Sequence, residues 1–341
     1  MDLFKEIKDK MKSNSDVTQG RGLESVITHI EIAERYHFRA KNERDEHLYT
    51  DAIYRTNHAF EGILKEAYVV LEGKNADHKS PHEIEEYLLK SNVLQGRVVD
   101  LLTNYRQNWR NPSTHDYRLF FSEQESFLAI VTVSAFVSIL LDQIIEKVAY
   151  SHKFKELENE AVLARERMPD FDSLLPIDKV LRILMSYSTY YIKNFDQMSP
   201  KSRSTANAEM AAFIERVAPD LKVELGPEFR ASDKTVRLDI VVNVVGTKVA
   251  IETREPKPRY GDREGLDDQA AINQLSEQLK AIGLGNGVVF FYPGRRDYTS
   301  AATTASTAWP KDLNLREVYS DDPAQFEDED IEEPVDLTEP S

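Results

Sequence analysis

The chain contains 341 residues and carries a formal net charge of −16 at pH 7. A hydrophobic fraction of 41% and a charged fraction of 30% are typical of globular proteins and exclude a wholly disordered chain. Because the sequence has no cysteine, it excludes disulfide scaffolds, zinc sites built from thiolates and cysteine nucleophiles. The length favours two domains.

We expect no segment of the sequence to enter a membrane or a secretion pathway. The initial stretch MDLFKEIKDKMK lacks the apolar core of a signal peptide. The longest apolar stretch, residues 127–141, is interrupted by Thr132, Ser134 and Ser138 and is shorter than the roughly 20 residues that a membrane span needs. We therefore expect a buried helix there, a cytoplasmic protein and no membrane partner.

Up to about residue 196 the sequence predicts helices. Apolar positions recur at helical spacing in three stretches, 23–40, 47–71 and 93–109. Pro81 opens a short helix, Ser122 and Glu125 are spaced as a capping box before a long helix over 123–147, and another amphipathic helix covers 178–194. The predicted organisation is an N-terminal extension over 1–21, an all-α domain over 22–150 and a helical linker over 151–204.

After Pro200 the predicted elements alternate between helix and strand. A helix over 206–217 precedes β-like runs at 222–224, 235–245 and 248–253, and a helix over 267–282 precedes a buried strand at 287–292. Gly246 and Thr247 are a hairpin turn signal. This order predicts an α/β domain over 205–320.

The charge is unevenly distributed along the chain. Residues 321–341 carry ten acidic residues and no basic ones, whereas residues 199–320 carry 17 of each sign. We expect a disordered acidic tail over 321–341. Neither folded region has the basic bias of a tight nonspecific DNA binder, although an enzyme that contacts a few phosphates does not need one.

The segment RNPSTH, residues 110–115, carries an arginine and a histidine five positions apart. On a continuous helix the two side chains would lie about 140° apart. Pro112 is expected to push Asn111 out of the α region and break the helix, which would let Arg110 and His115 converge. A histidine can move the proton of a 2′-hydroxyl, and an arginine can stabilise a charged phosphorane. Such a pair is also common at helix ends without any function.

This segment and its helical context resemble the HEPN superfamily, whose signature is R-x4–6-H with a polar residue after the arginine. The resemblance covers roughly residues 22–150. It implies an up-and-down helical bundle that forms a homodimer, in which two motifs build one metal-independent ribonuclease site. By this resemblance Arg110 and His115 are catalytic, Asn111 supports them, and RNA is the partner.

Three charged residues suggest a second site in the α/β domain. Asp239 and Glu252 lie on runs joined by the predicted hairpin, so their carboxylates can meet at one end of a sheet and hold Mg²⁺. Arg254 lies on the same face as Glu252 by strand alternation and could contact a scissile phosphate. Both acids could equally be ordinary strand residues that face solvent.

The order of elements over about 205–293 resembles the restriction-endonuclease-like, or PD-(D/E)xK, nuclease fold. The resemblance implies that Asp239 and Glu252 are metal ligands and that Glu209 or Glu215 is the acid on the first helix. Arg254 stands where this family has lysine, and Lys257 is a nearby substitute. Arginine binds phosphate but does not act as a proton-transfer base.

The first hypothesis is a metal-independent endoribonuclease with an additional PD-(D/E)xK-like nuclease or nucleic-acid-binding domain, of the kind found in prokaryotic phage defence or toxin systems. The second is a Mg²⁺-dependent DNA nuclease whose helical domain dimerises. The third is a noncatalytic nucleic-acid-binding or regulatory protein.

Overall fold

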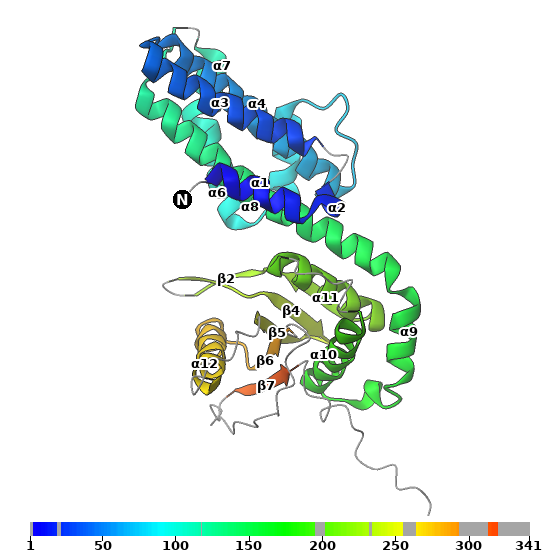
Figure 1. Cartoon of the computed structure of the whole chain (residues 1–341). Helices are drawn as coiled ribbons and strands as arrows, with labels where there is room; N and C mark the ends of the chain where they lie inside the picture. The colour runs from blue at the N-terminus through cyan, green and yellow to red at the C-terminus, as the bar shows by residue number, and fades with distance from the viewer. Residues whose placement is uncertain are drawn as a thin grey trace, which may run out of the picture. The chain divides into compact units, whose positions relative to one another are not determined.

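Figure 1 shows the computed structural model of the chain. The structure describes residues 3–18, 22–116, 118–194, 202–231, 234–254, 264–292 and 313–319. The chain divides into two compact units. The first comprises Met1–Glu156 with Pro200–Ala212, and the second comprises Leu157–Ser199 with Phe213–Ser341. The first unit is helical and the second holds a mixed sheet, which confirms the expected combination of an α and an α/β region.

The first unit is built from consecutive helices and one π-helical turn. These are α1 (Leu3–Ser13), α2 (Ser15–Thr18), α3 (Leu23–Glu43), α4 (His47–Glu72), α5 (Pro81–Ser91), α6 (Gly96–Tyr105), the π turn η1 (Arg106–Arg110), α7 (Asn111–His115) and α8 (Glu123–Glu156). The predicted helices over 23–40 and 47–71 lie within a few residues of α3 and α4, the stretch 93–109 covers α6 and most of η1, and the helix predicted over 123–147 continues to Glu156. The extension over 1–21 contains α1, whose Ile7 is fully buried in the core of this unit.

Helices α3 and α4 form a tight antiparallel pair. Arg44 ends α3 in the left-handed conformation, with its N–H bonded to the carbonyl of Ala40. A Cβ on Gly62 would lie 2.9 Å from Val26, so the two helices approach closely only because this position is glycine. Helix α4 provides the surface on which the segment 106–115 packs.

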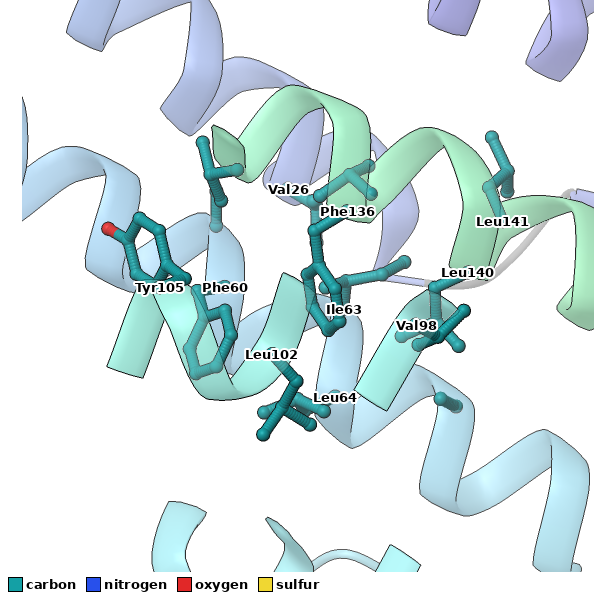
Figure 2. Packing of buried hydrophobic residues seen from close by; sticks show 14 of the residues in the cluster. Val26, Phe60, Ile63, Leu64, Val98, Leu102, Tyr105, Phe136, Leu140 and Leu141 are labelled. Atoms are coloured by element: carbon teal, nitrogen blue, oxygen red, sulfur yellow. The ribbon is translucent and has the colours of Figure 1, made fainter. Parts of the chain in front are cut away.

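Aromatic and aliphatic side chains from α4, α6 and α8 meet in the core of the first unit (Figure 2). The ring of Phe60 stacks 4.7 Å from that of Tyr105 and lies 5.1 Å from that of Phe136. Each fully buried side chain of this size stabilises the fold by roughly 1.5–3 kcal/mol. Since Tyr105 is the last residue of α6, the core holds the start of η1 against α4.

The apolar stretch 127–141 lies within α8, as predicted. By length and hydropathy alone α8 could cross a membrane, but 61% of its apolar window is buried inside the unit. Val133, Phe136, Val137 and Leu140 belong to the core, which explains the hydrophobicity of this helix.

The second unit contains the remaining elements. They are α9 (Glu158–Glu166), the 3-10 turn η2 (Phe171–Ser173), α10 (Pro176–Lys193), the end of α11 (Arg203–Val217), α12 (Glu264–Ile282) and the strands β1 (Lys222–Leu225), β2 (Glu228–Arg230), β3 (Thr235–Arg237), β4 (Ile240–Val244), β5 (Thr247–Arg254), β6 (Asn286–Phe291) and β7 (Asn314–Tyr319). The predicted strand 235–245 is thus divided into β3 and β4, and β2 and β7 were not predicted.

The main sheet has the order β1-β4-β5-β6-β7. Strand β4 runs antiparallel to both β1 and β5, whereas β5, β6 and β7 are parallel. Strands β4 and β5 form the predicted hairpin, but its turn is Val245–Gly246 rather than Gly246–Thr247. Both turn residues have positive φ, 49° and 86°, as a two-residue turn of type I′ requires.

Helices cover both faces of this sheet (Figure 1). On one face Ile272 and Leu275 of α12 pack with Ala250 and Val289. On the other, the ring of Tyr187 in α10 lies 6.0 Å from that of Phe290. The range expected to be a linker, 151–204, therefore includes a helix that packs on the sheet, and the structure assigns residues 157–199 to the second unit. The predicted tail over 321–341 lies outside the described residues.

Candidate functional site

The segment 106–115 remains helical, so the helix break expected at Pro112 is wrong. Asn111 has φ −68° and ψ −47°, which is the α region, and its N–H bonds to the carbonyl of Arg106 five residues earlier. This wider π turn explains the tolerance of proline, because the proline ring clashes with the carbonyl four residues earlier in a regular α-helix.

Arg110 and His115 therefore do not converge through a kink. The two residues are separated by the helical residues of α7, which places their side chains about 140° apart around the axis. Arg110 is half-buried, whereas His115 is the last residue of α7 and is exposed. Among the described residues no hydrogen bond joins these two side chains.

The guanidinium of Arg110 is held by two neighbours. Oε1 of Glu61 in α4 lies 3.5 Å from Nε and 3.5 Å from Nη2 of Arg110. Oδ1 of Asn111 accepts a hydrogen bond of 3.1 Å from Nη1. Sequence reasoning predicted Asn111 as a support but missed Glu61. The available signal was an acidic residue within the apolar stretch AFEGIL of the predicted helix 47–71.

A buried chain of hydrogen bonds also ties α7 to α4. The hydroxyl of Tyr105 lies 2.6 Å from Oγ1 of Thr56 and 2.9 Å from Oδ1 of Asn57, and Nδ2 of Asn57 donates to Oγ of Ser113 at 2.8 Å. The Ser113 hydroxyl donates to the carbonyl oxygen of Arg110 at 3.1 Å. Burial raises the pKa of the Tyr105 phenol far above its usual range, so this group stays a donor. The network was not predicted.

A pair of histidines lies on the α3–α4 surface. The imidazole rings of His29 and His58 stack with their centroids 5.0 Å apart. Burial, followed by the neighbouring His58 and Arg55, lowers the pKa of His29 below its ordinary value. The neutral form of His29 is therefore favoured.

In the second unit, strand β5 brings a carboxylate and a guanidinium together. Nη1 of Arg254 lies 2.7 Å from Oε1 of Glu252, and Nη2 donates to Oε1 of Gln274 in α12 at 2.8 Å. Glu252 is almost fully buried. Arg254 thus faces α12, and Glu252 lies on the same face of β5 as Arg254, as the strand alternation predicted.

Asp239 lies at the same end of the adjacent strand. It immediately precedes β4, whose Ile240 is opposite Ile251 of β5. Its Oδ2 accepts hydrogen bonds from the N–H of Thr253 at 2.8 Å and from the Thr253 hydroxyl at 2.9 Å. The structure thus ties Asp239 to Thr253, the residue between Glu252 and Arg254.

The other predicted metal ligands are placed differently. Glu209 is buried in the part of α11 that belongs to the first unit. Oε1 of Glu215 accepts a hydrogen bond of 2.9 Å from the backbone N–H of Val223 and so helps to start β1. Lys257 lies outside the described residues. Within the part of the chain that the structure describes, no group of three or more histidine, aspartate or glutamate side chains is placed to hold a metal ion.

A scan against protein-family models and searches of the curated proteins and of the solved structures return no match for this chain.

Proposed function

We propose that the chain is an endoribonuclease that uses Arg110 and His115 without a metal ion. The observation that carries this proposal is that Glu61 and Asn111 hold the guanidinium of Arg110. The exposed His115 follows at the end of the next helix, α7. This arrangement supports the roles that the resemblance to the HEPN superfamily implies.

The proposed reaction is a transesterification that releases the 3′ fragment with a 5′-hydroxyl end. The His115 imidazole takes the proton of a ribose 2′-hydroxyl as the oxygen attacks phosphorus. The bond from phosphorus to the 5′ oxygen breaks, and that oxygen receives a proton from an imidazolium. Arg110 stabilises the charge that develops on the phosphorane oxygens. The products are a 2′,3′-cyclic phosphate and a 5′-hydroxyl.

The separation of the two side chains favours a site built by two copies of the chain. Within one copy Arg110 and His115 point about 140° apart, so a single site would need the imidazole of one copy and the guanidinium of the other. Exposed apolar side chains on α8, Phe127, Leu128 and Val131, offer a surface for such a dimer.

The test compares RNA cleavage by the unaltered chain and by His115→Ala, each in EDTA. We expect the unaltered chain to leave 2′,3′-cyclic phosphate ends and the variant to lose about 10²–10⁴-fold in rate. His152→Ala, a change at an exposed histidine of α8, is the control. Full activity of a folded His115→Ala variant would overturn the assignment.

A second candidate is a Mg²⁺-dependent nuclease in the second unit. It is favoured by the placement of Asp239 beside the residues of β5 and by the order α11, β1, β4, β5, α12, β6, which resembles the restriction-endonuclease-like fold. Asp239 and Glu252 would hold the ion, which would supply an activated water. Arg254 would bind the phosphate but would not remove a proton.

We further propose that the chain acts on nucleic acid in the cytoplasm as a phage-defence effector or a toxin. Growth arrest on expression, relieved by His115→Ala or by Glu252→Gln, would identify the active unit. If the purified chain binds RNA or DNA but cleaves neither with or without Mg²⁺, the noncatalytic, regulatory hypothesis takes its place.

A further inference from the structure

We infer that Asn57 and Glu61 of α4 are positioning residues. They hold the two ends of the segment 110–115, and with them Arg110 and His115, in the positions that RNA cleavage requires. This inference rests on the proposed ribonuclease function. Asn57 and Glu61 are four residues apart and therefore lie on one face of α4. Asn57 bonds to Ser113 near the histidine end, and Glu61 contacts Arg110 at the other end.

The segment needs such a support because its own structure is weak. Helix α7 has five residues, which is too short to be stable by itself, and it follows a π turn. Ser113 is its anchored residue, with the side chain buried, and His115 lies two positions later. Loss of the Asn57–Ser113 bond would therefore free the backbone that carries His115.

The direction of the hydrogen bonds explains why residue 57 is an asparagine. The Ser113 hydroxyl has one proton, which it donates to the carbonyl oxygen of Arg110, so its partner at position 57 must itself be a donor. The amide nitrogen of Asn57 is that donor, and its Oδ1 lies 2.9 Å from the Tyr105 hydroxyl. An aspartate at position 57 would accept at both oxygens, so Ser113 would turn its proton away from Arg110.

Glu61 fixes the plane of the guanidinium at the other end. Its carboxylate lies against the Nε and Nη2 edge of Arg110, and Asn111 takes one proton of Nη1. An arginine has five N–H donors in a rigid fork, so donors on both Nη atoms are left for a phosphate. Glu61 thus orients Arg110 without contacting the substrate.

The experiment measures kcat and KM for RNA cleavage together with amide hydrogen exchange of residues 111–116. The variants are Asn57→Asp, Asn57→Ala, Glu61→Ala, Glu61→Gln and Tyr105→Phe, the last of which removes only a hydroxyl group. The matched control is Gln143→Ala, because Gln143 is a carboxamide as buried as Asn57 that bonds to the backbone of Val93 and Gln95 elsewhere in the unit.

We expect both Asn57 variants to lower kcat by about 10²-fold with little change in KM. They should also speed exchange of the Asp116 amide, which donates to the Pro112 carbonyl at 3.0 Å. Tyr105→Phe should lower kcat by roughly tenfold, and Glu61→Gln should retain more activity than Glu61→Ala because the amide oxygen still accepts from Arg110. Gln143→Ala should leave kcat and this exchange unchanged.

Two results separate the inference from the proposed function. If the unaltered chain cleaves RNA but Asn57→Ala and Gln143→Ala have equal kcat and equal exchange, the positioning role is wrong and the ribonuclease assignment stands. If the unaltered chain does not cleave RNA, the proposed function fails. Faster amide exchange confined to residues 111–116 in the Asn57 variants would then still support the role of Asn57 in holding this segment. Unchanged exchange rates would overturn that role.

Discussion

Arg254 and Glu252 lie two residues apart on β5, with Nη1 of the arginine 2.7 Å from a carboxylate oxygen of the glutamate. The guanidinium already contacts one oxygen of this carboxylate. A divalent ion at this position must therefore share Glu252 with Arg254 or displace it, which makes the metal affinity of the site directly testable.

We predict that Mg²⁺ raises the thermal unfolding temperature of the unaltered chain and that Glu252→Gln removes this increase. An ion at ten times its dissociation constant stabilises a folded protein by about 1.4 kcal/mol. The quantity to compare is the shift caused by Mg²⁺, measured by differential scanning calorimetry. Glu224→Gln, at a carboxylate of β1 that pairs with Lys248, is the control. An equal Mg²⁺ shift in the Glu252→Gln variant would exclude this residue as a ligand.

We predict that Arg110→Lys lowers the rate of RNA cleavage by about 10²–10³-fold, since lysine cannot reproduce the planar fork that contacts Glu61, Asn111 and a phosphate together. Initial rates with a defined RNA measure the effect. Arg39→Lys changes an exposed arginine that bonds to Glu43 through two nitrogens and should leave the rate unchanged. Equal rates in both variants would remove Arg110 from the site.

We predict that the chain is a dimer at micromolar concentration and that Phe127→Glu makes it monomeric. Phe127, Leu128 and Val131 expose between 42% and 55% of their surface on one stretch of α8, and a charge there would be desolvated in an interface. Sedimentation velocity measures the state. Leu175→Glu alters a comparably exposed side chain of the second unit and should leave the dimer intact. Monomeric unaltered protein would contradict the composite site.

We predict that the unfolding temperature falls as pH decreases through about 6.5, in part because of His37. Burial is the main cause that lowers the pKa of His37 below 6.5, Lys41 lowers it further, and Glu123 opposes them. Below pH 6.5 the unfolded chain binds a proton at this residue more readily than the folded chain does, so acid favours unfolding. The effect ends below the lowered pKa of the folded state.

His37→Gln is the test of this prediction, with melting curves recorded between pH 8 and pH 5. Glutamine can still bond to Ser126, whose Oγ lies 3.2 Å from Nδ1 of His37, but it does not titrate. We expect the unfolding temperature of the variant to decrease less steeply below pH 6.5, with the value at pH 8 as the reference. Parallel curves for the two proteins would show that His37 does not contribute.

Local patterns in the sequence predicted most of the regular structure. Apolar runs rich in β-branched residues and a glycine turn signal identified the region of β4 and β5, and helical spacing identified α3, α4 and α8. The same patterns do not show which element a helix packs on, so α10 was expected in a linker although its tyrosines lie against the sheet.

The sites were predictable only as far as neighbouring residues determine them. The sequence could predict that Asp239 and Glu252 lie on neighbouring strands, because a short hairpin fixes the register of its strands. Glu61 and Asn57 are about 50 residues from the segment that they contact. The spacing of apolar residues in the sequence does not reveal a contact between such distant residues. The π turn was missed because proline has a strong average effect that the wider turn at 106–110 removes.

The π turn also makes the segment sensitive to chain length. A π turn contains one residue more than the corresponding part of an α-helix, so deletion of the exposed Asn108 would let residues 96–115 form a regular helix of one residue fewer. Each later side chain would keep its direction relative to α4, because the deletion removes only the residue that the wider turn absorbs, and Ser113 would still face Asn57. Pro112 would then stand in a regular α-helix, where its ring clashes with the carbonyl four residues earlier. A one-residue deletion in the π turn would thus keep the phase of the motif and place the strain at Pro112.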